Sequence, residues 1–137
     1  MRSSKILTMV LAAAVVLGGC GDDASEPTSD AAASIDATAR EYEFTPEAWT
    51  VPTGESFTIE LTNDGTVEHE WAVLRLGEDI ESEADFAEDK VLFEVEALPA
   101  GESETATFTI DEPGTYQVIC AISGHFGQGM EGALSVE

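Results

Sequence analysis

The chain has 137 residues, with 28 acidic side chains against five basic ones and a formal net charge of −23 at pH 7. A surface this acidic excludes nucleic acid as a partner, because the phosphates would be repelled. It fits either the steering of a basic partner or solubility in a salty environment, and composition does not choose between these two roles.

The first 20 residues, MRSSKILTMVLAAAVVLGGC, have the layout of an export signal. Two basic residues precede an apolar run (6–17) that is too short to span a bilayer comfortably. The ending LGGC resembles a bacterial lipobox, in which Cys20 is lipidated and becomes the mature N-terminus; the alternative is an ordinary signal peptide cut near Gly19. We therefore expect residues 1–19 to be a lipoprotein-type signal and Cys20 to anchor the protein to a membrane outside the cytoplasm, at the cell membrane or in the periplasm.

The next stretch, residues 20–35, is predicted to be a flexible acidic tether. Its residues are small, polar and acidic, and they cannot bury enough apolar surface to fold. As a flexible coil it would span roughly 20–25 Å. Residues 36–137 are then one domain, expected to be monomeric, because roughly 100 residues suffice for a single core.

From about residue 40 onward, short runs of alternating apolar and polar residues predict strands. Turn signals such as NDG at 63–65 and DEPG at 111–114 separate them. The runs are EYEFTPEAWTV (41–51), SFTIEL (56–61), HEWAVLRL (69–76), KVLFEVEAL (90–98), ETATFTI (104–110), TYQVI (115–119) and GALSVE (132–137). They predict an all-β Greek-key sandwich or barrel of about seven to eight strands. The acidic segment (residues 77–90) breaks the pattern and is predicted to be a loop with a helical turn.

A glycine-spaced loop, CAISGHFGQGM, follows the TYQVI run and holds Cys120, His125 and Met130. Thiolate and imidazole are good ligands for copper or zinc, but structural zinc sites use four strong ligands and rarely a thioether. Two histidines, a cysteine and a weak axial methionine are the donor set of blue copper. His69, the other of the two histidines in the chain, begins the HEWAVL run and is placed to reach the same end of a sandwich.

Each of these residues also has an ordinary explanation. A lone cysteine is often an inert buried hydrophobe, and methionine fills gaps in cores. A lone histidine at a strand end is more often a surface residue. Their coincidence in and beside one glycine-rich loop favours a copper site over four separate ordinary explanations.

The pattern V-E-H-E-W…Y-x-x-x-C-x-x-x-x-H-x-x-x-x-M-x-G resembles the cupredoxins, the small blue copper proteins, over nearly the whole mature domain. The spacing of four residues on each side of the loop histidine is most similar to auracyanin- and rusticyanin-like members. The resemblance implies a cupredoxin-like fold and one type 1 copper ion, ligated by His69, Cys120, His125 and Met130.

The resemblance also implies roles around the ligands. Many cupredoxins have asparagine after the first ligand histidine, whereas this chain has Glu70, whose carboxylate accepts hydrogen bonds but cannot donate them. In cupredoxins the loop histidine reaches the surface amid apolar residues where a partner docks. Here that surface would be formed by His125, Ile122 and Phe126, with core packing an equally good explanation for Phe126.

These features predict a one-electron carrier between membrane-associated redox partners outside the cytoplasm, such as a cytochrome or a copper or heme oxidase complex. The protein is not expected to be an enzyme, because no ligand position stays open for a substrate. The alternative is an extracytoplasmic copper-storage or copper-delivery protein. A copper enzyme, such as a nitrite reductase or oxidase, would need further copper sites, and the chain has only two histidines.

Overall fold

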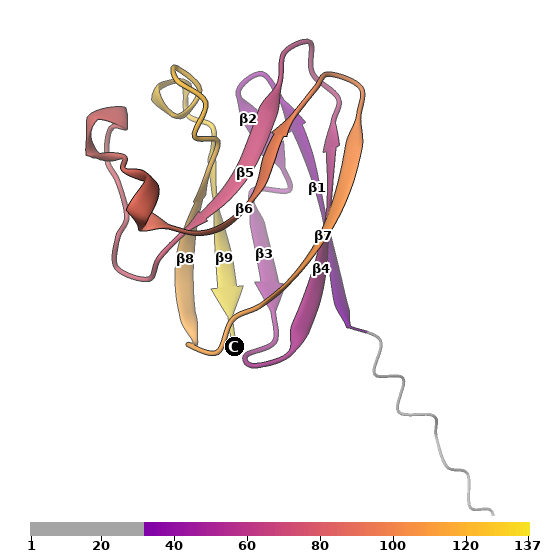
Figure 1. The fold of residues 1–137 in the computed structure, drawn as a ribbon, viewed down its shortest axis with the longest axis vertical. Coiled ribbons are helices and arrows are strands. Elements are labelled where there is room, and N and C mark those ends of the chain that lie inside the picture. Colours follow the sequence, from indigo (N-terminus) through magenta and orange to yellow (C-terminus); the bar gives the residue numbers. More distant parts are fainter. Residues whose placement is uncertain (1–31) are drawn as a thin grey trace, which may run out of the picture.

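Nine β-strands form two sheets that pack face to face in the part of the chain that the structure, a computed structural model, describes, residues 32–137 (Figure 1). The strands are β1 (Ala33–Arg40), β2 (Glu43–Thr45), β3 (Ala48–Val51), β4 (Ser56–Asn63), β5 (His69–Leu74), β6 (Val91–Leu98), β7 (Ser103–Thr109), β8 (Gly114–Ile119) and β9 (Glu131–Val136). One sheet has the order β2-β1-β4-β7, and the other has the order β3-β9-β8-β5-β6. The expected all-β sandwich is confirmed.

The alternation of apolar and polar residues places one face of each sheet in a shared core. Phe57, Ile59 and Leu61 of β4 are all fully buried, as are Trp71 and Val73 of β5. Burying a side chain of this size stabilises the fold by about 1.5–3 kcal/mol relative to leaving it exposed. The core therefore holds the two sheets together and fixes the positions of the strand ends.

The N-terminal edge differs from the expectation in strand count and in boundary. The run 41–51 was expected to be one region of strand, but it forms β2 and β3, and β1 precedes them, so the described residues hold nine strands. Strand β1 begins at Ala33, inside the stretch expected to be tether, and pairs in parallel with β4. Its inward residues are mostly alanines, which fill a sheet interface but produce a weak hydrophobic pattern. The expected signal at 1–19 and the expected lipidation at Cys20 lie outside the described residues.

The acidic segment has the loop-like form expected of it, with two 3-10 turns at Glu83–Asp85 and Glu88–Lys90. It is tied to strand β8, because the backbone of Ile80 exchanges two hydrogen bonds with the amide of Gln117. It is also tied to the loop at 120–130, because Oε1 of Glu83 accepts hydrogen bonds from the backbone N–H groups of Gly124 (2.7 Å) and Gly127 (3.1 Å). Figure 1 shows the two segments beside each other at one end of the sandwich.

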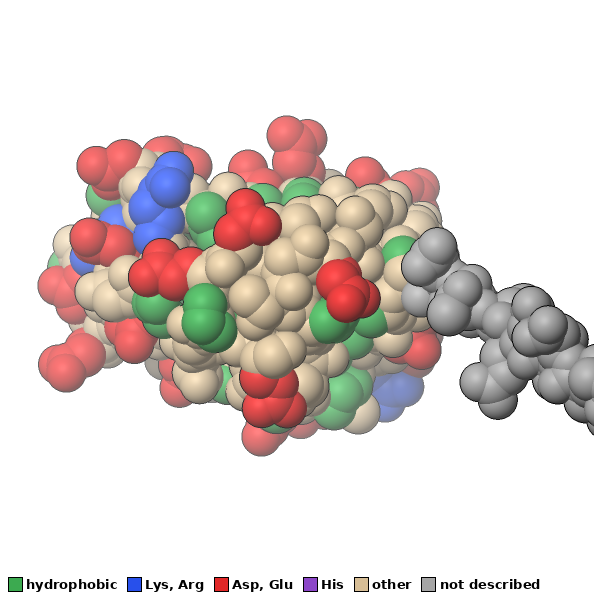
Figure 2. Space-filling view, turned by 90° about the horizontal axis from the view of Figure 1, so that it is seen from below, with side chains coloured by type: hydrophobic (Ala, Val, Ile, Leu, Met, Phe, Trp, Pro, Cys, Tyr) green, Lys and Arg blue, Asp and Glu red, His purple; other side chains and the backbone are tan. Residues whose placement is uncertain are grey.

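Acidic side chains are spread over the opposite end of the molecule, seen from below in Figure 2, and basic side chains appear among them in more than one place. No histidine is visible on that face. Within residues 32–137, no helix is long and apolar enough to cross a membrane.

Candidate metal centre

Three strand ends bring the predicted ligands together. His69 is the first residue of β5, Cys120 directly follows β8, and Met130 directly precedes β9. Strand β8 pairs with β5 on one side and with β9 on the other. Because both pairs are antiparallel, the start of β5 and the start of β9 lie beside the end of β8. The topology of this one sheet therefore places His69 next to the ligand loop (residues 120–130).

The donor atoms of His69, Cys120 and His125 converge in the interior. One donor atom from each lies within 4.8 Å of the other two. The sulfur of Cys120 is 3.3 Å from Nδ1 of His125, and the two imidazole centroids are 5.0 Å apart. His69 and Cys120 are fully buried, and His125 keeps 9% of its surface exposed. These three side chains form the cluster that the sequence predicted.

Met130 lies beside this cluster. The carbonyl of Met130 accepts a hydrogen bond of 3.2 Å from the N–H of Cys120, and its own N–H donates one of 3.2 Å to the carbonyl of His125. Its side chain is fully buried in the same core as Cys120. The loop ends at Gly129, whose φ of 98° is a left-handed conformation that favours glycine. The predicted axial role of Met130 stays a prediction.

Burial keeps the side chains of Cys120 and His69 uncharged. Burial raises the pKa of the Cys120 thiol to about 11, although the backbone N–H of Glu70 donates to its sulfur at 3.4 Å. Burial also lowers the pKa of His69, and the neighbouring His125 adds to this effect. Without a cation the two groups therefore stay a neutral thiol and a neutral imidazole. A bound metal ion reverses the balance for the thiol and deprotonates it.

The lack of hydrogen bonds at the His69 ring bears on whether a metal ion fits at this position. Both ring nitrogens are buried, and neither has a hydrogen-bond partner. An unsatisfied buried polar group costs about 1–3 kcal/mol, so such atoms are rare without a function. A metal ion among one sulfur and two imidazole nitrogens would satisfy one of these two ring nitrogens. A thiolate, two imidazoles and a neighbouring thioether fit copper better than structural zinc.

Glu70 touches the cluster through its backbone. Its N–H points at the sulfur of Cys120, whereas its side chain lies partly buried beside Glu94 of β6. Burial, and then the charge of Glu94, raise the pKa of the Glu70 carboxyl to about 7. The contact with the ligand sulfur is thus made by the amide, which any residue at this position supplies.

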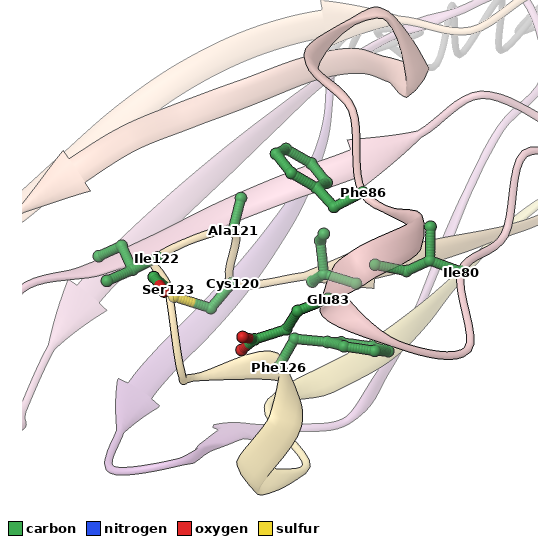
Figure 3. Close-up of a pocket in the computed structure, with 9 residues that line it drawn as sticks. Ile80, Glu83, Phe86, Cys120, Ala121, Ile122, Ser123 and Phe126 are labelled. Carbon is green, nitrogen blue, oxygen red and sulfur yellow. The ribbon is translucent and has the colours of Figure 1, made fainter.

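Ile122 and Phe126, the predicted apolar surround, are both half-buried and line a cavity of about 180 Å³ beside Cys120 (Figure 3). The opposite wall comes from the acidic segment, through Ile80, Glu83 and Phe86. Phe126 packs against the small apolar cluster that contains Ile80, and Ile122 packs against the main core. Each of the two side chains therefore packs against buried residues and is also partly exposed to solvent.

Two residues near the site went unnoticed in the sequence, Glu41 and Tyr42, which lie between β1 and β2. The ring of Tyr42 meets that of His125 edge-on, with centroids 5.1 Å apart. An oxygen of Glu41 lies 3.5 Å from Nε2 of His69. Hydrogen bonds from the backbone of Thr66, above all, lower the pKa of Glu41 to about 2, so it is ionised at neutral pH. No local pattern pointed to these residues, because the ligands that they touch are distant in the sequence.

The sequence model of the cupredoxin-like domain matches residues 7–134. The chain belongs to the cupredoxin-like domain family. This assignment agrees with the fold and with the convergence of donor atoms at the end of β8.

Several auracyanins are similar to this cupredoxin. Auracyanin-B of Chloroflexus aurantiacus is 28% identical over 109 residues, which cover 68% of this chain and 46% of the relative; the chain thus spans about half the length of that protein. The solved structure of dithionite-reduced auracyanin from Roseiflexus castenholzii is 26% identical, with a TM-score of 0.66 over 77% of this chain and 98% of that one. Auracyanin A of Chloroflexus aurantiacus, described as a "blue" copper protein, is 27% identical, with a TM-score of 0.65 over 76% and 98% of the two chains.

Proposed function

We propose that this cupredoxin binds one copper ion, which His69, Cys120 and His125 would hold with Met130 as a weak further ligand, and that it carries single electrons between redox partners. The observation that carries the proposal is the buried convergence of the three donor atoms within 4.8 Å. The blue copper description of the related auracyanin A supports the choice of metal. Bound copper would supply the one-electron chemistry, by cycling between Cu(I) and Cu(II).

The protein's own contribution is a rigid, dry site. The ligand loop is held by backbone hydrogen bonds from Cys120 to Met130 and from Met130 to His125, and by the carboxylate of Glu83. Packed ligands that rearrange little between two oxidation states keep the barrier to electron transfer low. The N–H of Glu70 donates toward the sulfur of Cys120 and favours its thiolate form.

Electrons would enter and leave near His125, the ligand that keeps a small exposed fraction. Ile122 and Phe126 flank it in the ligand loop and would offer apolar contact to a partner. The excess of acidic side chains would steer a partner with a basic surface, such as a cytochrome or a copper or heme oxidase complex. No open ligand position is available for a substrate in this donor set, which favours a carrier over an enzyme.

The proposed location is the outer face of a membrane, where a lipidated Cys20 and the acidic stretch after it would tether a monomeric domain. The support is the order of basic residues, apolar run and LGGC in the leader. Labelling of cells with a radioactive fatty acid tests the anchor. Incorporation that disappears in Cys20→Ala supports it, and a protein released unlabelled contradicts it.

Copper storage or delivery is the alternative function. Such a protein needs metal that exchanges readily. These ligands are buried, and backbone hydrogen bonds hold their loop at both ends. Reversible redox cycling without loss of metal therefore separates the carrier from the storage protein.

A titration with Cu(II) tests the proposal on the chain from residue 21 onward, followed by visible absorption and EPR. We expect an intense blue or green band that saturates at one equivalent, is bleached by ascorbate and returns on oxidation. Colourless binding, or copper lost on reduction, would favour storage or delivery. No binding would overturn the proposal.

A further inference from the structure

We propose that Glu41 is a positioning residue for the metal centre. Its carboxylate accepts a hydrogen bond from Nε2 of His69 and so directs Nδ1 of His69 toward the metal. This inference rests on the proposed copper function, and it concerns a residue that lies 28 positions before the ligand that it orients.

The contact between Glu41 and His69 is the first observation. An oxygen of Glu41 lies 3.5 Å from Nε2 of the fully buried His69 ring. This separation is long for a hydrogen bond, and neither ring nitrogen of His69 has a hydrogen-bond partner among the described residues. The carboxylate oxygen of Glu41 is nevertheless the acceptor that Nε2 faces. With Nε2 facing the carboxylate, Nδ1 is the nitrogen left for a metal, as in His125, whose Nδ1 faces the sulfur of Cys120.

The rigidity of the carboxylate is the second observation. The same oxygen accepts hydrogen bonds from the backbone N–H groups of Thr66 and Val67 (3.0 Å for Val67) and from the hydroxyl of Thr66 (3.1 Å). These donors belong to the turn that leads into His69. These hydrogen bonds therefore hold the carboxylate of Glu41 against the segment that carries His69 and keep its charge in place.

The absence of a side chain at Gly65 is the third observation. A Cβ at this position would lie 2.6 Å from the oxygen of Glu41 and 2.8 Å from Nε2 of His69. Both distances are far below van der Waals contact. Gly65 thus leaves the space in which the carboxylate and the imidazole approach each other, a close approach that glycine alone permits.

The arrangement has a consequence for the copper. A carboxylate that accepts from the remote nitrogen of a ligand histidine fixes the tautomer and makes the other nitrogen a stronger donor. A stronger donor nitrogen and a nearby negative charge both favour Cu(II) over Cu(I). They therefore lower the reduction potential of the bound copper. Since Tyr42 packs on His125 from the same turn, residues 41 and 42 together contact both ligand histidines.

The first test needs no copper. In the metal-free, 15N-labelled protein near neutral pH, long-range 1H–15N spectra report which nitrogen of His69 carries the proton. We expect the Nε2–H tautomer in the wild type and a mixture of tautomers in Glu41→Ala. An Nδ1–H tautomer in the wild type would overturn the proposal, whether or not the protein binds copper. The measurement thus separates failure of this inference from failure of the proposed function.

The second test uses Glu41→Gln, which keeps the shape but removes the charge, in the copper-loaded protein. Its matched control is Glu43→Gln, two residues away, on an exposed strand position. We expect Glu41→Gln to bind Cu(II) about 10- to 100-fold more weakly and to raise the reduction potential, with Glu43→Gln close to wild type. Equal affinities and potentials in the two variants would contradict the proposal.

Gly65→Ala supplies an independent variant, because its methyl group separates Glu41 from His69 without removing either. It should weaken Cu(II) binding and raise the potential as Glu41→Gln does. Unfolding curves of the metal-free proteins identify any variant that fails to fold, and the tautomer of the wild type still decides in that case. A folded Gly65→Ala with wild-type affinity and potential would count against the proposal.

Discussion

The sulfur of Cys120 lies 3.3 Å from Nδ1 of His125, although neither residue belongs to a strand and five positions separate them. Backbone hydrogen bonds on both sides hold this pair: the N–H of Cys120 donates to Met130, and the N–H of His125 donates to Ile122. The loop therefore holds two donor atoms at contact distance. Because named contacts fix these side chains, the effects of single substitutions can be predicted.

Met130→Leu should keep copper and colour but raise the reduction potential, because a weak donor to Cu(II) is lost. Leucine and methionine have similar volumes, so the metal-free protein should lose less than about 1.5 kcal/mol of unfolding free energy. Voltammetry of the copper-loaded variant gives the potential. An unchanged potential would show that Met130 is not the axial ligand.

Removal of copper should lower the midpoint of thermal unfolding, because the metal binds the folded state and satisfies one of the unpartnered ring nitrogens of His69. At a free copper concentration 1,000-fold above Kd, the stabilisation is about 4 kcal/mol. Calorimetry with and without one equivalent of copper measures the shift. Cys120→Ser is the control and should show little copper-dependent shift; a full shift in that variant would exclude the thiolate as a ligand.

Glu83→Ala should loosen the ligand loop, because the carboxylate accepts hydrogen bonds from Gly124 and Gly127. We expect a loss of about 1–2 kcal/mol in unfolding free energy, since both bonds are solvent-accessible, and faster transfer of copper to a chelator. Glu81→Ala, an exposed acidic position in the same segment, is the matched control. Equal chelation rates in the two variants would mean that the acidic segment does not restrain the loop.

Gly132→Ala should destabilise the fold, because its Cβ would lie 2.7 Å from the carbonyl oxygen of Glu47 and 2.8 Å from the ring of Trp49. Overpacking against backbone and a core ring costs about 1–3 kcal/mol. Gly127→Ala is the comparison, because its Cβ would meet the side chain of Glu83 at an ordinary 3.4 Å. Chemical denaturation measures both, and equal stabilities would contradict the packing argument.

The class of fold and the residues of the cluster can be read from the amino-acid pattern alone. Strict alternation in runs such as SFTIEL can bury only one face, so it specifies a sandwich strand. The ligand candidates stood out because the chain holds two histidines, and its second cysteine sits in a glycine-rich loop after a strand. Strand β1 (Ala33–Arg40) was not predicted, because alanines facing a sheet interface carry little hydrophobic signal.

The assembly of the cluster and the contacts that hold it depend on how distant parts of the chain pack together. The pairing of β8 with both β5 and β9 brings His69 to the ligand loop, and the turn after β1 brings Glu41 and Tyr42 against the two histidines. The acidic segment reaches the loop through Glu83. These contacts join residues from 28 positions apart (Glu41 and His69) to 83 positions apart (Tyr42 and His125), and they depend on strand register and sheet packing. Local periodicity indicates where a strand lies and which of its faces is buried, but it does not say which strands pair or which loops meet.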